Sequence, residues 1–217
     1  NEFEFYLSDL KAEALIVPAG SNTPAVTVAA ALGIPVLELA SASDEAAGLF
    51  TLSKRMLGAA KTARSAAEDI ALTLHTSGTT SRPKMVPLTH QSLCLSACNI
   101  ARWFSLVESD CCLSIMPLFH IHGLIGAVLS SLSAGASFVC TPGFDVTRCF
   151  EWMAQFRPTW YTAVPTMHQA ILARSEQHKD VLTNHRLRFI RSCSSALAPN
   201  LMDNLEGAFR VPVLESY

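Results

Sequence analysis

The chain has 217 residues, of which 50% are hydrophobic and 16% are charged. Its 16 basic and 18 acidic residues nearly balance, and no run of lysines or arginines forms the basic patch that binds nucleic acid or an anionic membrane. The composition therefore excludes a disordered chain and favours a globular protein with a small-molecule partner and no nucleic-acid partner.

The seven cysteines are scattered through apolar segments and form no C-x-x-C pair. This pattern indicates neither a disulfide framework nor a zinc site, so we expect a cytoplasmic protein without a metal site of its own. The uncharged stretch 121–142 is long enough to raise the question of a membrane span. Its serines and glycines interrupt the apolar run, and we expect no span.

The first 69 residues predict a βαβ unit followed by a linker. Gly33 marks the end of the central helix. From residue 48 the chain becomes rich in alanine and basic residues, which favours an exposed linker or surface segment. The expected elements are a helix at 2–11, a strand at 14–17, a helix at 24–32 and a strand at 35–39.

Residues 70–217 predict a mainly parallel sheet with helices on both faces, an α/β fold. A strand at 70–74 leads into a loop rich in hydroxyl groups, and Thr89 caps a helix at 90–104. In such sheets, ligands bind beyond the carboxyl ends of the strands. Strands are expected at 111–116, 136–140, 159–163, 188–191 and 211–214, and helices at 123–133, 146–156, 166–174 and 199–208.

The loop between residues 74 and 89 reads LHTSGTTSRPKMVPLT. Hydroxyl and backbone N–H donors crowd around Gly78, which can adopt positive φ, and successive N–H groups in such a turn bind anions. Lys84 adds a positive charge. An ordinary Ser/Thr-rich surface turn is the alternative. The common nucleotide loop G-x-x-x-x-G-K-[ST] is excluded, because Pro83 precedes the lysine and Met85 follows it.

This loop resembles the phosphate loop of the adenylate-forming superfamily, which includes acyl-CoA synthetases, coumarate CoA ligases and luciferases. That family has glycine at the position of Met85, and a methionine with positive φ there would cost about 1–2 kcal/mol. The resemblance implies that the loop and Lys84 hold the phosphates of ATP. The matching residues are Thr76, Ser77, Gly78, Thr79, Thr80, Pro83 and Lys84.

A second segment, PLFHIHGL at 117–124, follows a predicted strand. It is similar to a Pro-x-Phe-His segment of the same family, and His120 is the matching residue. The resemblance implies that His120 orients the acyl carboxylate or gates the approach of CoA. His122 has no general counterpart in the family, and a half-buried, hydrogen-bonded histidine is the alternative at this segment.

A third segment, LRFIRSCSSAL at 187–197, is similar to the strand end that lines the family's adenine pocket. Cys193, Ser194 and Ser195 stand in the places of Gly-Ala-Ala, and small residues let a planar base approach the backbone. A Ser-rich turn before a helix is the alternative. Tyr217 matches the family tyrosine whose ring stacks on adenine.

Three strings, HTSGTTSRPK, WYTAVPTMHQ and LRFIRSCSSALAP, resemble the oxalate CoA ligase group within the family. A small dicarboxylate needs cationic or hydroxyl donors for its second carboxylate. Packing and helix termini are the alternative roles for His168 and Arg191. The candidate donors are His122, His168, Arg191, Ser192 and Ser194.

The resemblance implies a two-step ligase that uses ATP, Mg²⁺ and CoA, with an acyl-adenylate as intermediate. Residues 70–217 would be the AMP-binding core of the large N-terminal domain, with the C-terminal domain absent. The family's second catalytic lysine belongs to that later sequence, so we expect this piece alone to turn over poorly. A catalytically silent nucleotide-binding or interaction module of the same fold is the alternative. The acid and the oligomeric state stay open.

Overall fold

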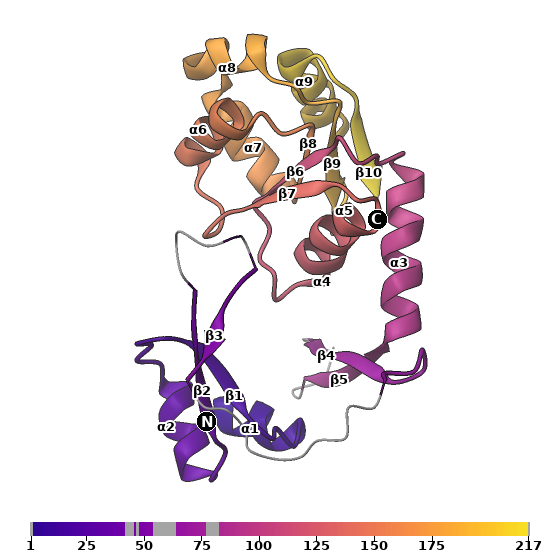
Figure 1. Cartoon of the computed structure of the whole chain (residues 1–217). Coiled ribbons are helices and arrows are strands. Elements are labelled where there is room, and N and C mark those ends of the chain that lie inside the picture. Colours follow the sequence, from indigo (N-terminus) through magenta and orange to yellow (C-terminus); the bar gives the residue numbers. More distant parts are fainter. Residues whose placement is uncertain (1, 42–45, 47, 54–63, 77–82, 217) are drawn as a thin grey trace. The chain divides into compact units, whose positions relative to one another are not determined.

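The computed structural model describes residues 2–41, 46, 48–53, 64–76 and 83–216. The chain divides into two compact units, Asn1–Ser65 and Ala66–Tyr217. Within the part of the chain that is described, no helix combines the length and apolar character needed to cross a bilayer. Figure 1 shows the course of the chain through both units.

The first unit contains the predicted βαβ structure. Strands β1 (Leu15–Pro18) and β2 (Val36–Ala40) pair in parallel, and helix α2 (Pro24–Ala31) connects them. Helix α1 (Glu2–Asp9) precedes this arrangement. Strand β3 (Thr51–Leu52) pairs antiparallel with β2. It lies inside the predicted linker or surface segment, and both of its residues are exposed.

The second unit begins with a β-hairpin followed by a helix. Strand β4 (Ile70–Thr76) pairs antiparallel with β5 (Lys84–Thr89). Helix α3 (His90–Trp103) begins directly after β5, and its N-cap is Thr89, as predicted. The Thr89 hydroxyl accepts a hydrogen bond from the backbone N–H of Ser92 at 3.1 Å. The prediction of one continuous loop from 74 to 89 was wrong, because its second half is a strand.

The body of the second unit is a five-stranded sheet in the order β10-β9-β8-β6-β7. All four pairings are parallel, which confirms the predicted α/β class. The strands are β6 (Cys111–Ser114), β7 (Ser137–Cys140), β8 (Trp160–Ala163), β9 (Phe189–Cys193) and β10 (Val213–Ser216).

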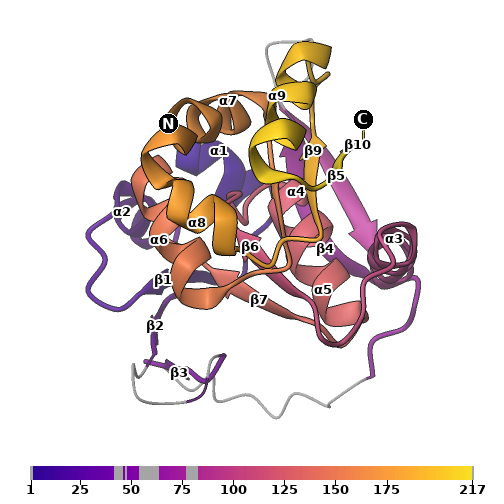
Figure 2. The ribbon, with the colours of Figure 1, turned by 90° about the horizontal axis from the view of Figure 1, so that it is seen from above.

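Helices cover both faces of this sheet, as Figures 1 and 2 show. One face packs against α6, α7, α8 and α9, and the other packs against α3 and the helical segment after β6. The helix α8 and the 3₁₀ turn before it were not predicted. The elements of the first face are α6 (Val146–Phe156), α7 (Pro165–Arg174), η2 (Ser175–His178), α8 (Lys179–Asn184) and α9 (Pro199–Phe209).

The side-chain alternation of the strands divides the core in two. Leu113, Tyr161 and Ile190 are aligned in register and are buried against α6–α9. Their neighbours Cys112 and Trp160, with Phe189 on the next strand, belong to the other cluster. These central strands are buried on both faces, as is typical of a parallel sheet covered by helices on each side.

The helical segment after β6 contains a π-helix. It starts as α4 (Ile121–Gly123), continues as η1 (Leu124–Leu129) in π geometry and ends as α5 (Ser130–Ser133). The sequence predicted an ordinary helix at 123–133. π-Segments inside helices occur frequently at functional sites, because the wider turn redirects carbonyl groups and side chains.

Candidate active site

The carboxyl ends of β6, β8 and β9 lie side by side, because the strands are adjacent and parallel. Register pairs Ser114 with Thr162 and Thr162 with Arg191, so these residues form one row near the ends of the strands. The chain leaves β6 through Pro117 and enters α4 at Ile121. Two of the three strand-end motifs predicted from the sequence therefore meet at this edge.

His122 is the buried centre of this edge. It is 6% exposed, and its two ring nitrogens contact residues of two different strand ends. Nε2 lies 2.6 Å from Oγ1 of Thr162 on β8, and Nδ1 lies 3.0 Å from Oγ of Ser194 after β9. Burial, and secondly the positive charge of Arg191, lower the pKa of His122 to about 4. The imidazole is therefore neutral at physiological pH.

The burial of Thr162 fixes the tautomer of this neutral ring. Thr162 is 0% exposed, and within the described chain the imidazole is the hydrogen-bond partner of its hydroxyl. A buried hydroxyl hydrogen needs an acceptor, which makes Nε2 the acceptor and leaves the proton on Nδ1. Nδ1–H then donates to Ser194, so the hydroxyl hydrogen of Ser194 is available to a ligand. Ser194 has φ 75°, a left-handed conformation that is uncommon for serine.

Arg191 extends from β9 toward the π-helix. Its Nη1 donates to the carbonyl of Gly126 at 3.1 Å and its Nε donates to Oγ of Ser216 at 3.0 Å. A Cβ on Gly126 would lie 2.5 Å from Nη1, so any residue other than glycine would displace the guanidinium from this position. The guanidinium carbon also lies 5.3 Å from the centre of the Phe104 ring.

These side chains line a cavity of about 330 Å³. Its walls combine apolar residues of α3 and the π-segment with polar groups from the strand ends, as in small-molecule sites. The lining residues are Ser96, Ile100, Ile121, His122, Ile125, Gly126, Arg191, Cys193 and Ser194.

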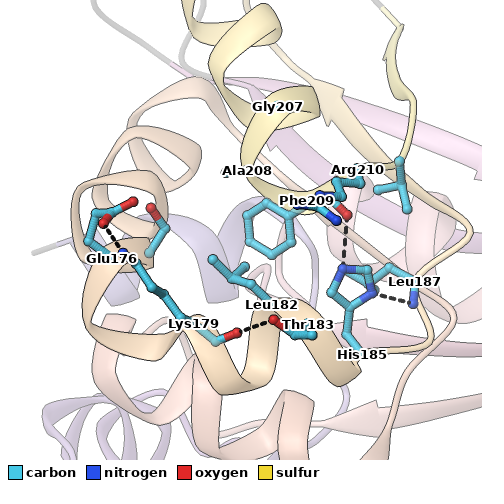
Figure 3. Close-up of a pocket in the computed structure, with 12 residues that line it drawn as sticks. Glu176, Lys179, Leu182, Thr183, His185, Leu187, Gly207, Ala208, Phe209 and Arg210 are labelled. Carbon is cyan, nitrogen blue, oxygen red and sulfur yellow. Dashed lines mark hydrogen bonds and ion pairs between the residues drawn. The ribbon is translucent and has the colours of Figure 1, made fainter.

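A larger cavity of about 530 Å³ lies elsewhere on the second unit, between the η2–α8 segment and the end of α9. Figure 3 shows the imidazole of His185 there, with Nε2 bonded to the carbonyl of Phe209 at 2.9 Å and Nδ1 bonded to the N–H of Leu187 at 3.1 Å. These residues precede β9 and β10, at the amino ends of the strands. This cavity is therefore remote from the strand ends at which parallel sheets bind ligands.

The predicted site residues do not all gather in the smaller cavity. Four of them line it: His122, Arg191, Cys193 and Ser194. His120 is exposed just before α4, with its ring 4.7 Å from that of Phe119. Ser195 is also exposed.

His168 and Ser192 lie on the opposite face of the sheet. Ser192 follows Arg191 on β9, and the strand alternation points its side chain the other way. His168 is fully buried on α7, with Nδ1 3.3 Å from the hydroxyl of Tyr161. Burial lowers the pKa of His168 to about 4. The backbone carbonyls of Arg191 and Ala163 raise the pKa, but their effect is smaller than that of burial.

The hairpin brings two residues of the predicted phosphate loop together. Thr76 and Lys84 are opposite each other at the end of the β4–β5 ladder, and both are exposed. Met85 pairs with His75 and does not have positive φ, so the expected backbone strain is absent. Ser77, Gly78, Thr79 and Thr80, like Tyr217, lie outside the described residues.

Thr162 and Gly126 were missed by the sequence interpretation. Thr162 stands in WYTA, where it read only as part of a buried strand, and its polar side chain on a central strand was the available signal. Gly126 lies inside a predicted helix, where an isolated glycine frequently has a packing reason.

The described residues offer no group of three His, Cys, Asp or Glu side chains suited to a metal ion. Among these residues we therefore name no protein ligand for the magnesium ion that the family resemblance implies.

Comparisons with known proteins identify the class of the chain. The family described as AMP-binding enzyme matches residues 1–217, so the chain belongs to this family. This confirms the family to which the three motifs pointed.

Individual relatives narrow the class. The oxalate–CoA ligase of Arabidopsis thaliana is 44% identical over 220 residues, covering 100% of this chain and 43% of that protein. The oxalate–CoA ligase of Saccharomyces cerevisiae is 36% identical over 239 residues, again covering 100% of this chain and 43% of the relative. The chain thus spans less than half the length of these relatives.

Solved structures agree with the fold. The crystal structure of ATP-bound MatB from Rhodopseudomonas palustris matches with a TM-score of 0.77 at 26% identity, covering 99% of this chain and 41% of that one. The parallel sheet with helices on both faces is therefore the fold of this family's N-terminal domain.

Proposed function

We propose that the complete gene product is an ATP-dependent acid–thiol ligase that joins a small carboxylic acid, oxalate in the first place, to CoA. The observation that carries this proposal is the cavity of about 330 Å³ at the strand ends, with one cationic and several hydroxyl and imidazole groups in its wall. The two oxalate–CoA ligases similar to the whole chain support the choice of acid.

The proposed reaction has two steps. A carboxylate oxygen attacks the α-phosphorus of ATP, the bond to the β-phosphate oxygen breaks, and pyrophosphate leaves. The CoA thiolate then attacks the carbonyl carbon of the acyl-adenylate, and AMP leaves. Such transfers depend mainly on positioning and on stabilisation of charge. Magnesium would enter this chemistry as the counter-ion of the triphosphate.

We assign Lys84 and the loop residues Thr76, Ser77, Gly78, Thr79 and Thr80 to the β- and γ-phosphates. The pairing of Thr76 with Lys84 supports this assignment. It places the positive charge of Lys84 next to the residue at which the predicted phosphate-binding segment begins. His120 is assigned to the reacting carboxylate or the CoA approach. Its exposure at the start of α4 is compatible with a gating role.

The adenine is assigned to residues 193–195 and to Tyr217. The partly exposed Cys193 and exposed Ser194 and Ser195 leave the end of β9 accessible to a planar base. The acyl group is assigned to the cavity beside His122, Arg191 and Ser194. Because His168 and Ser192 lie on the other face of the sheet, we give them no contact with the substrate.

Hydroxylamine trapping of the adenylate tests this proposal. The complete gene product would be incubated with ATP, Mg²⁺ and hydroxylamine over oxalate, malonate, acetate and longer acids. We expect hydroxamate with oxalate above all. If no acid yields hydroxamate while ATP still binds, the protein is a silent nucleotide-binding module instead.

A further inference from the structure

Two arginines, one just before β9 and one in the middle of it, differ in their partners. Arg188, just before the strand, is paired with the buried carboxylate of Asp110, with Nε at 2.8 Å and Nη2 at 2.6 Å. Arg191 is 6% exposed, and its partners are the neutral atoms Gly126 O, Ser216 Oγ and, at 3.5 Å, Cys193 Sγ. Among the residues that the structure describes, no carboxylate forms an ion pair with Arg191.

A buried cation without a counter-charge is costly, because its hydration is lost and no ion pair replaces it. Arginine stays protonated in proteins, so it cannot avoid this cost by becoming neutral. The fold nonetheless accommodates the buried guanidinium of Arg191. Gly126, in the π-segment, supplies both the carbonyl that holds Nη1 and the space that a Cβ would fill.

The charge of Arg191 is presented to the cavity. Arg191 is the only ionic side chain among the described lining residues, since His122 is neutral. Guanidinium has five N–H groups, and the contacts given above engage three of them. The unmatched charge therefore lies in the wall of a cavity whose other polar groups are a neutral imidazole, hydroxyls and a thiol.

We propose that Arg191 is the specificity-determining residue for the second anionic group of a small dicarboxylic acid, while His122 orients the Ser194 hydroxyl as a donor to the same ligand. This inference rests on the proposed function and adds the residue that selects the acid. It follows that an acid of the same size with a neutral far end is discriminated against. A close charge in a site shielded from water outweighs a neutral hydrogen bond.

Oxalate and oxamate form the matched substrate pair, because oxamate replaces one carboxylate with a neutral amide of nearly the same shape. The initial rate of pyrophosphate release by the complete gene product would give kcat/KM for each acid. The wild type, Arg191→Met and Arg191→Lys would be compared, with KM for ATP as a second readout. Met retains much of the arginine stem without its charge, and Lys retains the charge.

We expect the wild type to prefer oxalate by at least about tenfold, which corresponds to about 1.4 kcal/mol. In Arg191→Met this preference falls about tenfold, while KM for ATP changes less than twofold. Arg191→Lys keeps most of the preference. Equal losses for both acids in Arg191→Met, with the ratio unchanged, would show a structural role and overturn the inference.

The ratio of kcat/KM for oxalate and oxamate in the wild type is also a test of the inference, independent of the Arg191→Met variant. If Arg191→Met does not fold, as judged by thermal unfolding, a wild-type ratio near one still overturns the inference, and a high ratio that Arg191→Lys preserves supports it. Activation of neither acid by the wild type refutes oxalate as the substrate and, with it, this inference, and failure with every acid in the hydroxamate assay refutes the proposed function itself; both outcomes differ from an unchanged ratio.

Discussion

Gly126 illustrates how one missing side chain positions a charged group. Gly126→Ala places a Cβ where Nη1 of Arg191 now lies, at 2.5 Å, and the guanidinium must move. Because the obstructed group is the end of a flexible side chain, the main loss is its hydrogen bond to the Gly126 carbonyl, and we expect a decrease of about 1 kcal/mol in the free energy of unfolding. Urea denaturation measures it.

Gly207→Ala is the matched control. Gly207 lies inside helix α9, and a Cβ there meets nothing within 4 Å. Because alanine is the better helix former, this variant gains about 0.5–1 kcal/mol. A Gly126→Ala variant as stable as the control would contradict the close packing of Arg191 against the π-segment.

His122 and His168 predict a pH dependence of stability. Burial lowers the pKa of each to about 4 in the folded chain, against an ordinary value of 6.5. The unfolded chain therefore binds protons first as the pH falls. The contribution of these two histidines to the free energy of unfolding is fully present above pH 6.5. It is lost progressively as the pH falls toward 4, by up to about 1.4 kcal/mol per pH unit for each histidine.

The window between pH 6.5 and 5 separates these histidines from exposed carboxylates, which titrate lower. Urea unfolding at several pH values in this window measures the slope, and His168→Gln should reduce it by about half. A flat stability across the window would contradict neutral, buried histidines.

At the scale of elements, Asp110 connects the loop after α3 to two strands. The carboxylate receives both nitrogens of Arg188, the hydroxyl of Thr159 at 2.6 Å and the N–H of Val107 at 2.9 Å. Burial alone would raise the pKa of Asp110, but the hydrogen bonds from Arg188, Thr159 and Val107 and the charge of Arg188 lower it overall.

Removal of Arg188 leaves this carboxylate buried without its cation. We expect Arg188→Met to cost about 3 kcal/mol of unfolding free energy, since the broken pair is buried on the Asp110 side. Arg174→Met removes an arginine whose contact with Thr147 is long, at 3.4 Å, and exposed, so it should change stability by less than about 0.5 kcal/mol. Equal effects of the two variants in urea unfolding would contradict the role of Asp110.

The β4–β5 hairpin predicts that Met85 does not weaken nucleotide binding. Met85 has ordinary strand geometry opposite His75, so glycine relieves no strain there. In calorimetric titration with ATP, Met85→Gly and the parent should agree within about twofold, because the ligand contacts assigned above do not include this side chain. A much tighter Met85→Gly variant would show that the methionine obstructs the loop.

Some elements that form the proposed site could be predicted from the sequence, and others could not. The parallel strands were predictable, because strands buried on both faces are apolar throughout and alternate with amphipathic helices. The π-segment was not, since 124–129 has the pattern of an ordinary helix. The contacts of His122 were also hidden, because Thr162 and Ser194 reach it only through the order of the strands.

At the scale of the whole molecule, the proposed site lies at the carboxyl ends of the strands in the second unit. The parallel order of β6, β8 and β9 brings three distant segments to it, and the π-segment packs Gly126 against the end of β9. The larger cavity at the amino ends of the strands shows that size alone does not identify the site. The direction of the strands does, because ligands bind beyond their carboxyl ends.

Acid-dependent exchange of labelled pyrophosphate into ATP tests the central claim most directly, since it reports the first step without CoA. The complete gene product should catalyse this exchange when oxalate is present, and exchange should disappear when the acid is omitted. Absence of exchange with oxalate and with every other acid tried, from a folded protein that binds ATP, would contradict the assignment of this edge as an acyl-adenylating site.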